Sequence, residues 1–232
     1  MNKYMISTAV VALASMALVG AANARTIAAS VGGAPTGVSY ENFDSIVAPS
    51  TATTTLASGV KVSYTGDASA VTGDSSGINA APYLSGGNGV GFGSQPDGKD
   101  TTTYLTAGVG SVRIDMPTNE LYLGLLWGSV DDFNTLSFYD SSNNLIDTVT
   151  GADVIASPNG DQGLNGTVYV NITLDSEFAY VVASESKNQY AFEFDNLAFN
   201  PTDPTVPSPE PITLSLFGAG LAGLGFARRR KA

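Results

Sequence analysis

The chain has 232 residues, contains neither histidine nor cysteine, and carries a formal net charge of −11. Without these two residue types it cannot form a cysteine nucleophile, a Ser-His-Asp triad, or a metal site with imidazole or thiolate ligands. Residues 25–200 hold five basic and nineteen acidic residues, a formal charge of −14. This excess should repel nucleic acid and anionic membrane surfaces, so we expect no nucleic-acid partner.

The first 24 residues have the pattern of a secretory signal peptide. Lys3 lies in a short basic segment, residues 6–19 are apolar, and Ala22 and Ala24 form an A-x-A cleavage site. We therefore predict export and cleavage by signal peptidase after Ala24. An uncleaved membrane anchor is the alternative, but the apolar stretch is shorter than the ~20 residues that a span requires.

Beyond the signal peptide, short apolar stretches alternate with clusters of Gly, Asn, Asp, Ser and Pro as far as residue 200. This pattern is typical of antiparallel sandwiches and barrels, and no segment has a convincing helical period. We predict one all-β domain over residues 25–200, a single antiparallel β-sandwich. Residues 65–103 have few large apolar side chains, so we expect long loops there, a common place for ligand binding on a β scaffold.

Several strands are predicted from alternation with a period of two residues. Residues 112–116 and 120–127 alternate in this way, and Pro117-Thr118-Asn119 between them predicts a hairpin turn. Residues 133–140 and 144–150 flank the turn sequence SSNN and predict a second hairpin. The most regular alternation is in residues 167–174.

A polar loop with an aromatic residue, Asp131-Asp132-Phe133-Asn134, follows Trp127. Such a loop could hold a sugar by stacking and by hydrogen bonds. Trp127 itself is in phase with the leucines at 121, 123 and 125, so we expect it in the core. A glycosidase would need two carboxylates about 5 to 10 Å apart. The abundance of acidic residues does not indicate such a pair, and we expect no enzymatic activity.

The final strand is predicted over residues 189–199, where the alternation slips at Asp195-Asn196 and indicates a bulge. Glu41 and Asp44, near the start of the body, would meet Asp195 if the first and last strands lie side by side. Carboxylate oxygens of this kind suit Ca²⁺, so these three residues are a candidate structural calcium site. The alternative is that they are exposed acids closing strand ends, because no contiguous calcium-loop motif is present.

The C-terminal region has three parts. Residues 201–208 belong to a proline-rich stretch that we interpret as an extended linker, and Pro209-Glu210-Pro211 follows it. Residues 212–227 carry no charge and predict a transmembrane helix, which at about 24 Å is short for a bilayer. The basic stop that closes the chain comprises Arg228, Arg229, Arg230 and Lys231, which should stay cytoplasmic.

This order of Pro-Glu-Pro, short apolar helix and basic cluster over residues 209–232 resembles the PEP-CTERM sorting signal of Gram-negative bacteria that make extracellular polysaccharide. The resemblance implies processing by an exosortase, a membrane transpeptidase-like enzyme that cuts its substrate near this motif. Pro209, Glu210 and Pro211 would then be substrate residues and not catalytic ones. A permanent tail anchor is the alternative, but it does not account for the Pro-Glu-Pro sequence.

The body resembles, with the segments YENFD, LWGSVDDFNTLSFYD and FEFDNLAF, the jelly-roll-like body of one subgroup of exosortase-dependent surface proteins, similar in outline to carbohydrate-binding modules. The resemblance implies a protein held transiently in the inner membrane and then placed at the cell surface or in the extracellular matrix of a biofilm. It also implies polysaccharide as a ligand. A purely structural matrix component and a secreted polysaccharide hydrolase are the alternatives.

Overall fold

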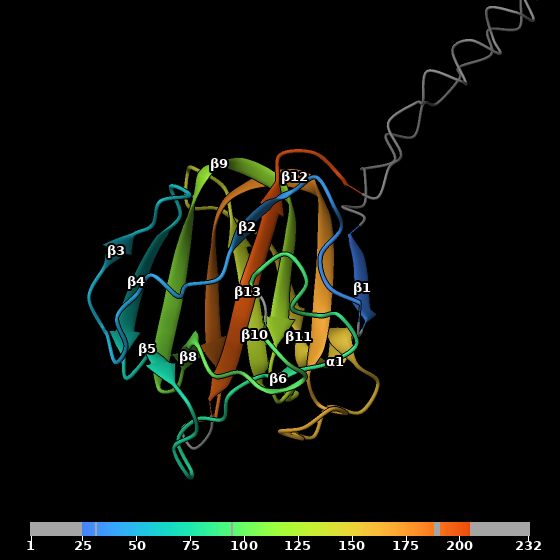
Figure 1. Ribbon diagram of the computed structural model, residues 1–232. Helices are drawn as coiled ribbons and strands as arrows, with labels where there is room; N and C mark the ends of the chain where they lie inside the picture. The colour runs from blue at the N-terminus through green and yellow to red at the C-terminus, as the bar shows by residue number, and fades with distance from the viewer. Residues whose placement is uncertain (1–24, 31, 94, 188–190, 205–232) are drawn as a thin grey trace, which may run out of the picture.

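The computed structural model describes residues 25–30, 32–93, 95–187 and 191–204 (Figure 1). Four predictions lie outside the described residues: the signal peptide with Ala22 and Ala24, the motif Pro209-Glu210-Pro211, the helix at 212–227, and the basic cluster at 228–231. The linker predicted at 201–208 is described only as far as residue 204.

Strands dominate the described part of the chain, and its one helix, α1 (Gly151–Val154), is a single turn. The strands in chain order are β1 (Thr26–Ser30), β2 (Ser39–Glu41), β3 (Thr54–Thr55), β4 (Lys61–Gly66), β5 (Ser69–Thr72), β6 (Tyr83–Leu84), β7 (Gly98–Lys99), β8 (Thr103–Ala107), β9 (Gly110–Trp127), β10 (Asn134–Tyr139), β11 (Leu145–Thr150), β12 (Val168–Glu185) and β13 (Phe192–Asn200). The prediction of an all-β body is confirmed.

Eleven of the described strands pair into one antiparallel sheet, and β6 and β7 form a separate small pair. The main path runs β11-β10-β12-β9-β13-β8-β5, while β1, β2, β3 and β4 branch from it. The two long strands, β9 and β12, pair with each other on both sides of residues 116–119 of β9. Their hydrogen-bonded pairing therefore makes one continuous sheet, where the sandwich prediction implied two.

The hairpin predicted at Pro117-Thr118-Asn119 is wrong, because β9 continues through these residues. Asp115 pairs with Tyr180 and Glu120 with Phe178, so four residues of β9 lie opposite one residue of β12. Residues 117–119 are exposed in this bulge. Proline has no N–H to donate to a neighbouring strand, and a bulge is a place where that donor is not needed.

The hairpin of β10 and β11 is confirmed, with Leu136 opposite Val149 in the register. Its turn is closed by Asp140, whose carboxylate accepts hydrogen bonds from the backbone N–H groups of Ser142 and Asn144, both at 2.8 Å. Aspartate commonly stabilises turns in this way.

One large cluster of buried apolar side chains holds the sheet together. It includes residues from both halves of β9 and β12, and it explains why the alternation of residues 167–174 was regular: Val170, Ile172 and Leu174 all point into it. Trp127 is fully buried and stacks on Phe192 with ring centroids 4.3 Å apart. The prediction that Trp127 belongs to the core is confirmed.

The last strand also behaves as predicted. The register between β13 and β9 shifts between Asp195 and Ala198, and Asn196 has a φ of 53°. This bulge lets Phe194 and Leu197 both face the core. Strand β2 pairs with β13 through Glu41 and Leu197, so the early and late strands do lie side by side.

A second, smaller apolar cluster lies on the opposite face of β9, β12 and β13. Tyr122, Tyr169 and Ala198 from these strands are covered by Leu84 and Phe92. Both covering residues come from the connection between β5 and β8, which passes in front of β13 in Figure 1. As predicted for residues 65–103, this connection contains only short strands.

Candidate functional site

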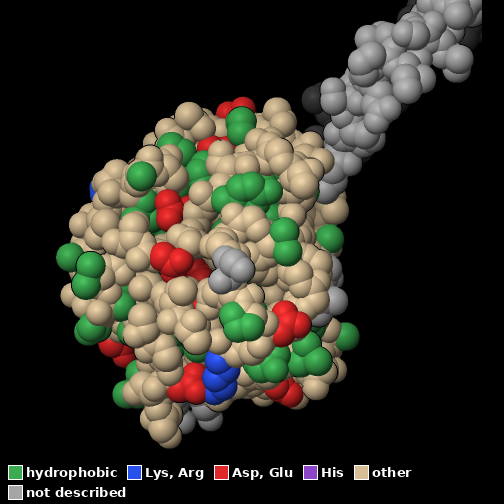
Figure 2. Space-filling model, viewed as in Figure 1, with side chains coloured by type: hydrophobic (Ala, Val, Ile, Leu, Met, Phe, Trp, Pro, Cys, Tyr) green, Lys and Arg blue, Asp and Glu red, His purple; other side chains and the backbone are tan. Residues whose placement is uncertain are grey.

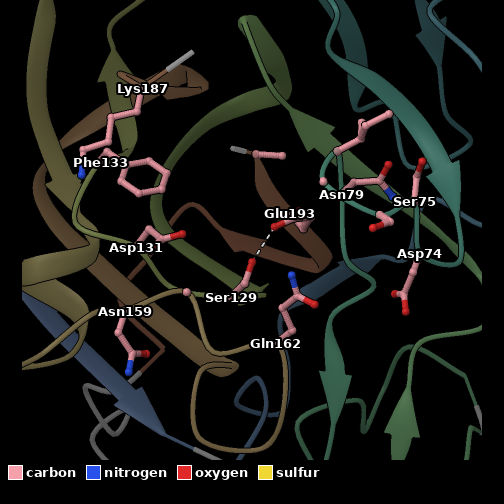
Figure 3. A pocket seen from close by; sticks show the side chains of 15 residues that line it. Asp74, Ser75, Asn79, Ser129, Asp131, Phe133, Asn159, Gln162, Lys187 and Glu193 are labelled. Atoms are coloured by element: carbon pink, nitrogen blue, oxygen red, sulfur yellow. Dashed lines mark hydrogen bonds between the residues drawn. The ribbon is translucent and has the colours of Figure 1, made fainter. Parts of the chain in front are cut away.

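A cleft of about 770 Å³ opens where four loop segments meet. Its walls come from the connection between β5 and β6, the loop after β9, the loop after α1, and the chain around the start of β13 (Figure 3). The lining residues with polar or aromatic side chains include Asp74, Ser75, Asn79, Ser129, Asp131, Phe133, Asn159, Gln162, Lys187 and Glu193.

The loops approach one another closely at Asp131. Gly160 has a φ of +68°, and a Cβ added to it would lie 2.8 Å from a carboxylate oxygen of Asp131. Its backbone N–H donates to the carbonyl of Val130 at 3.0 Å. Glycine fits here because it adopts positive φ without cost and leaves space for the Asp131 carboxylate.

Glu193 is the most buried acid of the cleft, with 3% of its surface exposed. One carboxylate oxygen accepts a hydrogen bond from the backbone N–H of Ala80 at 2.9 Å, and the other from the hydroxyl of Ser129 at 2.6 Å (Figure 3). Burial raises the pKa of Glu193 to about 7; these two bonds act against the rise, and the nearby charge of Asp131 adds to it. Glu193 therefore titrates near neutral pH.

Asp131 differs from Glu193 in having free oxygens. Among the described residues, its carboxylate has no hydrogen-bond partner, and Figure 3 shows it directed into the cleft. Burial and the neighbouring Asp132 raise the pKa of Asp131 to about 6, against the opposing effect of Lys187. Asp131 is thus an acceptor that a ligand can reach.

An aromatic ring and a cation complete one wall of the cleft. The ammonium of Lys187 lies 4.5 Å from the centroid of the Phe133 ring, a cation–π contact, and 3.2 Å from a carboxylate oxygen of Asp132. Both charged side chains are more than half exposed. The contacts of Lys187 with Phe133 and Asp132 hold the segment after β12 beside the loop after β9.

Two of the four residues in the loop considered for sugar binding line this cleft. Asp131 and Phe133 line the cleft, whereas Asp132 points to solvent and Asn134 is fully buried. Sequence reasoning missed Glu193, Gln162 and Asn79, which come from segments far apart in the chain. The one signal for Glu193 was an acid placed inside the apolar strand sequence FEFDNLAF.

The three residues of the predicted calcium site differ in their hydrogen bonding and in their exposure to solvent. Glu41 accepts hydrogen bonds from the backbone N–H of Phe43 at 3.2 Å and from the hydroxyl of Ser58 at 2.6 Å, so both of its oxygens are engaged. Asp44 is exposed, while Asp195 is fully buried. Within the described ranges, no group of three or more acidic side chains is arranged to hold a metal ion.

Fold and site together define an all-β protein with a carboxylate-lined and amide-lined cleft. A comparison with protein-family models identifies residues 209–231 as the PEP-CTERM protein-sorting motif, which confirms the assignment made from Pro209-Glu210-Pro211 and marks the chain as an exosortase-sorted, exported protein. Searches of curated proteins and of solved structures found no match. In the part of the chain that the structure describes, no helix is long and apolar enough to cross a membrane.

Proposed function

We propose that this exported protein binds neutral polysaccharide through the cleft around Asp131 and acts at the cell surface or in the extracellular matrix after exosortase processing. The observation that carries the proposal is the set of unpaired hydrogen-bonding groups facing the cleft. The antiparallel sheet has one core, which takes residues from both ends of β9 and β12. This arrangement is consistent with the jelly-roll-like interpretation of the body.

Sugar hydroxyls need both donors and acceptors at short range. The Asp131 carboxylate and the Gln162 amide have no partner among the described residues, and the amide nitrogen of Asn159 is likewise unpaired there. Asp131 is partly buried and therefore gains most from a ligand that satisfies it, whereas Asn159 and Gln162 are exposed and accessible to a bound sugar. A polyol ligand would satisfy all three side chains.

The charge of the cleft limits the class of polysaccharide. Three acidic side chains, Asp74, Asp131 and Glu193, line it together with one cation, Lys187; Asp74 is ion-paired with Lys99, and Glu193 is only partly ionised at neutral pH. The surface follows the same trend: on the face shown in Figure 2, acidic side chains are spread widely and basic ones are few. A ligand rich in uronic acid or sulfate would be repelled, so neutral hexose polymers are the expected ligands.

A hydrolase is the second candidate, because two carboxyl groups with raised pKa values share the cleft. We place binding ahead of hydrolysis for a geometric reason. Both oxygens of Glu193 already accept hydrogen bonds from Ala80 and Ser129, and only 3% of its surface is exposed, so a glycosidic bond has little access to this carboxyl. Release of reducing sugar from a bound polysaccharide would reverse the order of the two candidates.

Binding can be tested by calorimetric titration of the exported protein with a neutral glucan and with a uronic-acid polymer. We expect saturable heat only with the neutral polymer, and a roughly tenfold weaker affinity in Asp131→Asn, since a hydrogen bond to a charged group contributes about 1–1.5 kcal/mol more than the neutral bond that asparagine can still accept. Asp97→Asn removes the same charge from an exposed residue that does not line the cleft and is the matched control. No heat with any polymer would favour a purely structural matrix component.

Sorting has its own test, which does not depend on the ligand. Intact mass spectrometry of the protein from its own host should show loss of the segment carrying Arg228 to Lys231 when exosortase is present. In a strain without exosortase the segment should remain. A wild-type product that keeps the basic cluster would contradict processing at the motif.

A further inference from the structure

Asp195 occupies an unusual position for a charged residue. It lies on β13 opposite Leu126, and 1% of its surface is exposed. Neither of its carboxylate oxygens has a hydrogen-bond partner among the described residues. Burying an uncompensated carboxylate costs several kcal/mol, and burial and the nearby Asp100 raise the pKa of Asp195 against the effect of the Asn196 backbone N–H, so this group should either hold a proton or bind a cation.

A second buried acid lies close to Asp195. The carboxyl of Asp100, 2% exposed, lies within hydrogen-bonding reach of Asp195, but two carboxylates can only accept. One oxygen of Asp100 accepts from the side chain of Gln95 at 3.1 Å and from the backbone N–H and hydroxyl of Thr102 at 2.8 and 2.7 Å. Its other oxygen is buried and has no partner in the described residues.

The surroundings add negative charge and supply no cation. The carboxylate of Asp44 is close enough to interact with both acids. The ion pairs of the described chain involve Arg25, Lys99, Arg113 and Lys187, and none of them includes these three carboxylates. Three buried oxygens, two from Asp195 and one from Asp100, thus have neither a hydrogen-bond partner nor an ion-pair partner in the described residues.

A bound cation resolves this arrangement. With no histidine or cysteine in the chain, its ligands must be oxygens, which selects hard cations. Calcium accepts an irregular shell of six to eight oxygens, so two carboxylates can be completed by carbonyl groups and water. Asn196, the neighbour of Asp195, and Gln95, which donates a hydrogen bond to Asp100, both line a cavity of about 320 Å³.

We propose that Asp100 and Asp195 bind one calcium ion, which ties the segment after β7 to strand β13. This site differs from the one expected from sequence: Asp195 remains, Asp100 replaces Glu41, and Asp44 contributes charge from nearby. The site is separate from the polysaccharide cleft, so its existence does not depend on the proposed ligand.

The competing explanation is that the two carboxyls share a proton. Thermal unfolding of the exported protein at pH 7.5, in EDTA and then with increasing CaCl₂, distinguishes the two. We expect a saturable rise of roughly 5–10 °C in Tm at 100 times the dissociation constant. A shared proton predicts no response to calcium, and that result would overturn the proposal.

Variants locate the site. Asp195→Asn and Asp100→Asn should each abolish the calcium response, and both should fold, because an asparagine amide can donate a hydrogen bond to the remaining carboxylate. Glu177→Gln removes an exposed acid on β12 and should keep the full response. A response retained in Asp195→Asn would refute the assignment, and an equal rise with MgCl₂ would refute the choice of calcium.

Discussion

Glu193 gives the folded protein a pH dependence whose size can be worked out. Its pKa rises from 4.5 to about 7 on burial, and each pKa unit corresponds to about 1.36 kcal/mol. Ionising Glu193 therefore costs the folded state about 3 kcal/mol. Because the folded pKa is raised, this contribution to stability is complete below pH 4.5 and is lost as the pH rises through 7.

The variant Glu193→Gln isolates this effect, since glutamine keeps the shape of the side chain and an acceptor oxygen for the Ala80 N–H but does not ionise. Urea denaturation at pH 5, 6, 7 and 8 should show wild type and variant close together at pH 5. At pH 8 the variant should be more stable by about 3 kcal/mol. Asp131 also titrates in this range, but it is present in both proteins. Parallel pH profiles would refute the reasoning.

Three further substitutions test the core, the cleft and the bulge by urea denaturation. For the cleft, polysaccharide binding is also measured by calorimetric titration. Trp127→Ala should lower the free energy of unfolding by about 3–5 kcal/mol, because it empties the space beside Phe192; a loss below about 1 kcal/mol would contradict its core position. Gly160→Ala should cost about 1–3 kcal/mol and weaken polysaccharide binding, because its Cβ would displace Asp131; unchanged binding would contradict this. Asn196→Val should cost about 1–2 kcal/mol more than Asn196→Gly, since only the valine is strained at a φ of 53°; equal costs would argue against the bulge.

Local signals in the sequence were sufficient for the parts of the fold that local chemistry determines. The β10–β11 hairpin follows from alternation on both sides of a turn that Asp140 closes by itself. The bulge on β13 follows from a change of phase at Asp195-Asn196. In both cases the residues whose pattern predicts the feature are the same residues that form the turn or the bulge.

The strand β9 shows where such reasoning stops. Pro117-Thr118-Asn119 has the composition of a turn, and only the partner strand decides the outcome. Tyr180 and Phe178 of β12 hold the two sides of this stretch in one continuous strand. The cleft depends on long-range contacts in the same way. Asp131 and Phe133 belong to one loop and can be predicted together, but no local sequence pattern places Glu193 or Gln162 beside them.

Strand β13 connects the two proposed sites. Phe192 and Phe194 face the core, so Glu193 and Asp195 between and after them share the opposite face. The connection between β5 and β8 closes over both acids, with Ala80 on Glu193 and Asp100 on Asp195. If calcium binds at Asp100 and Asp195 as proposed, it would restrain this connection, which includes residues 74–79 of the cleft wall, and would lower the entropic cost of binding polysaccharide there. Because such coupling is reciprocal, polysaccharide bound in the proposed cleft would then tighten calcium binding by the same factor.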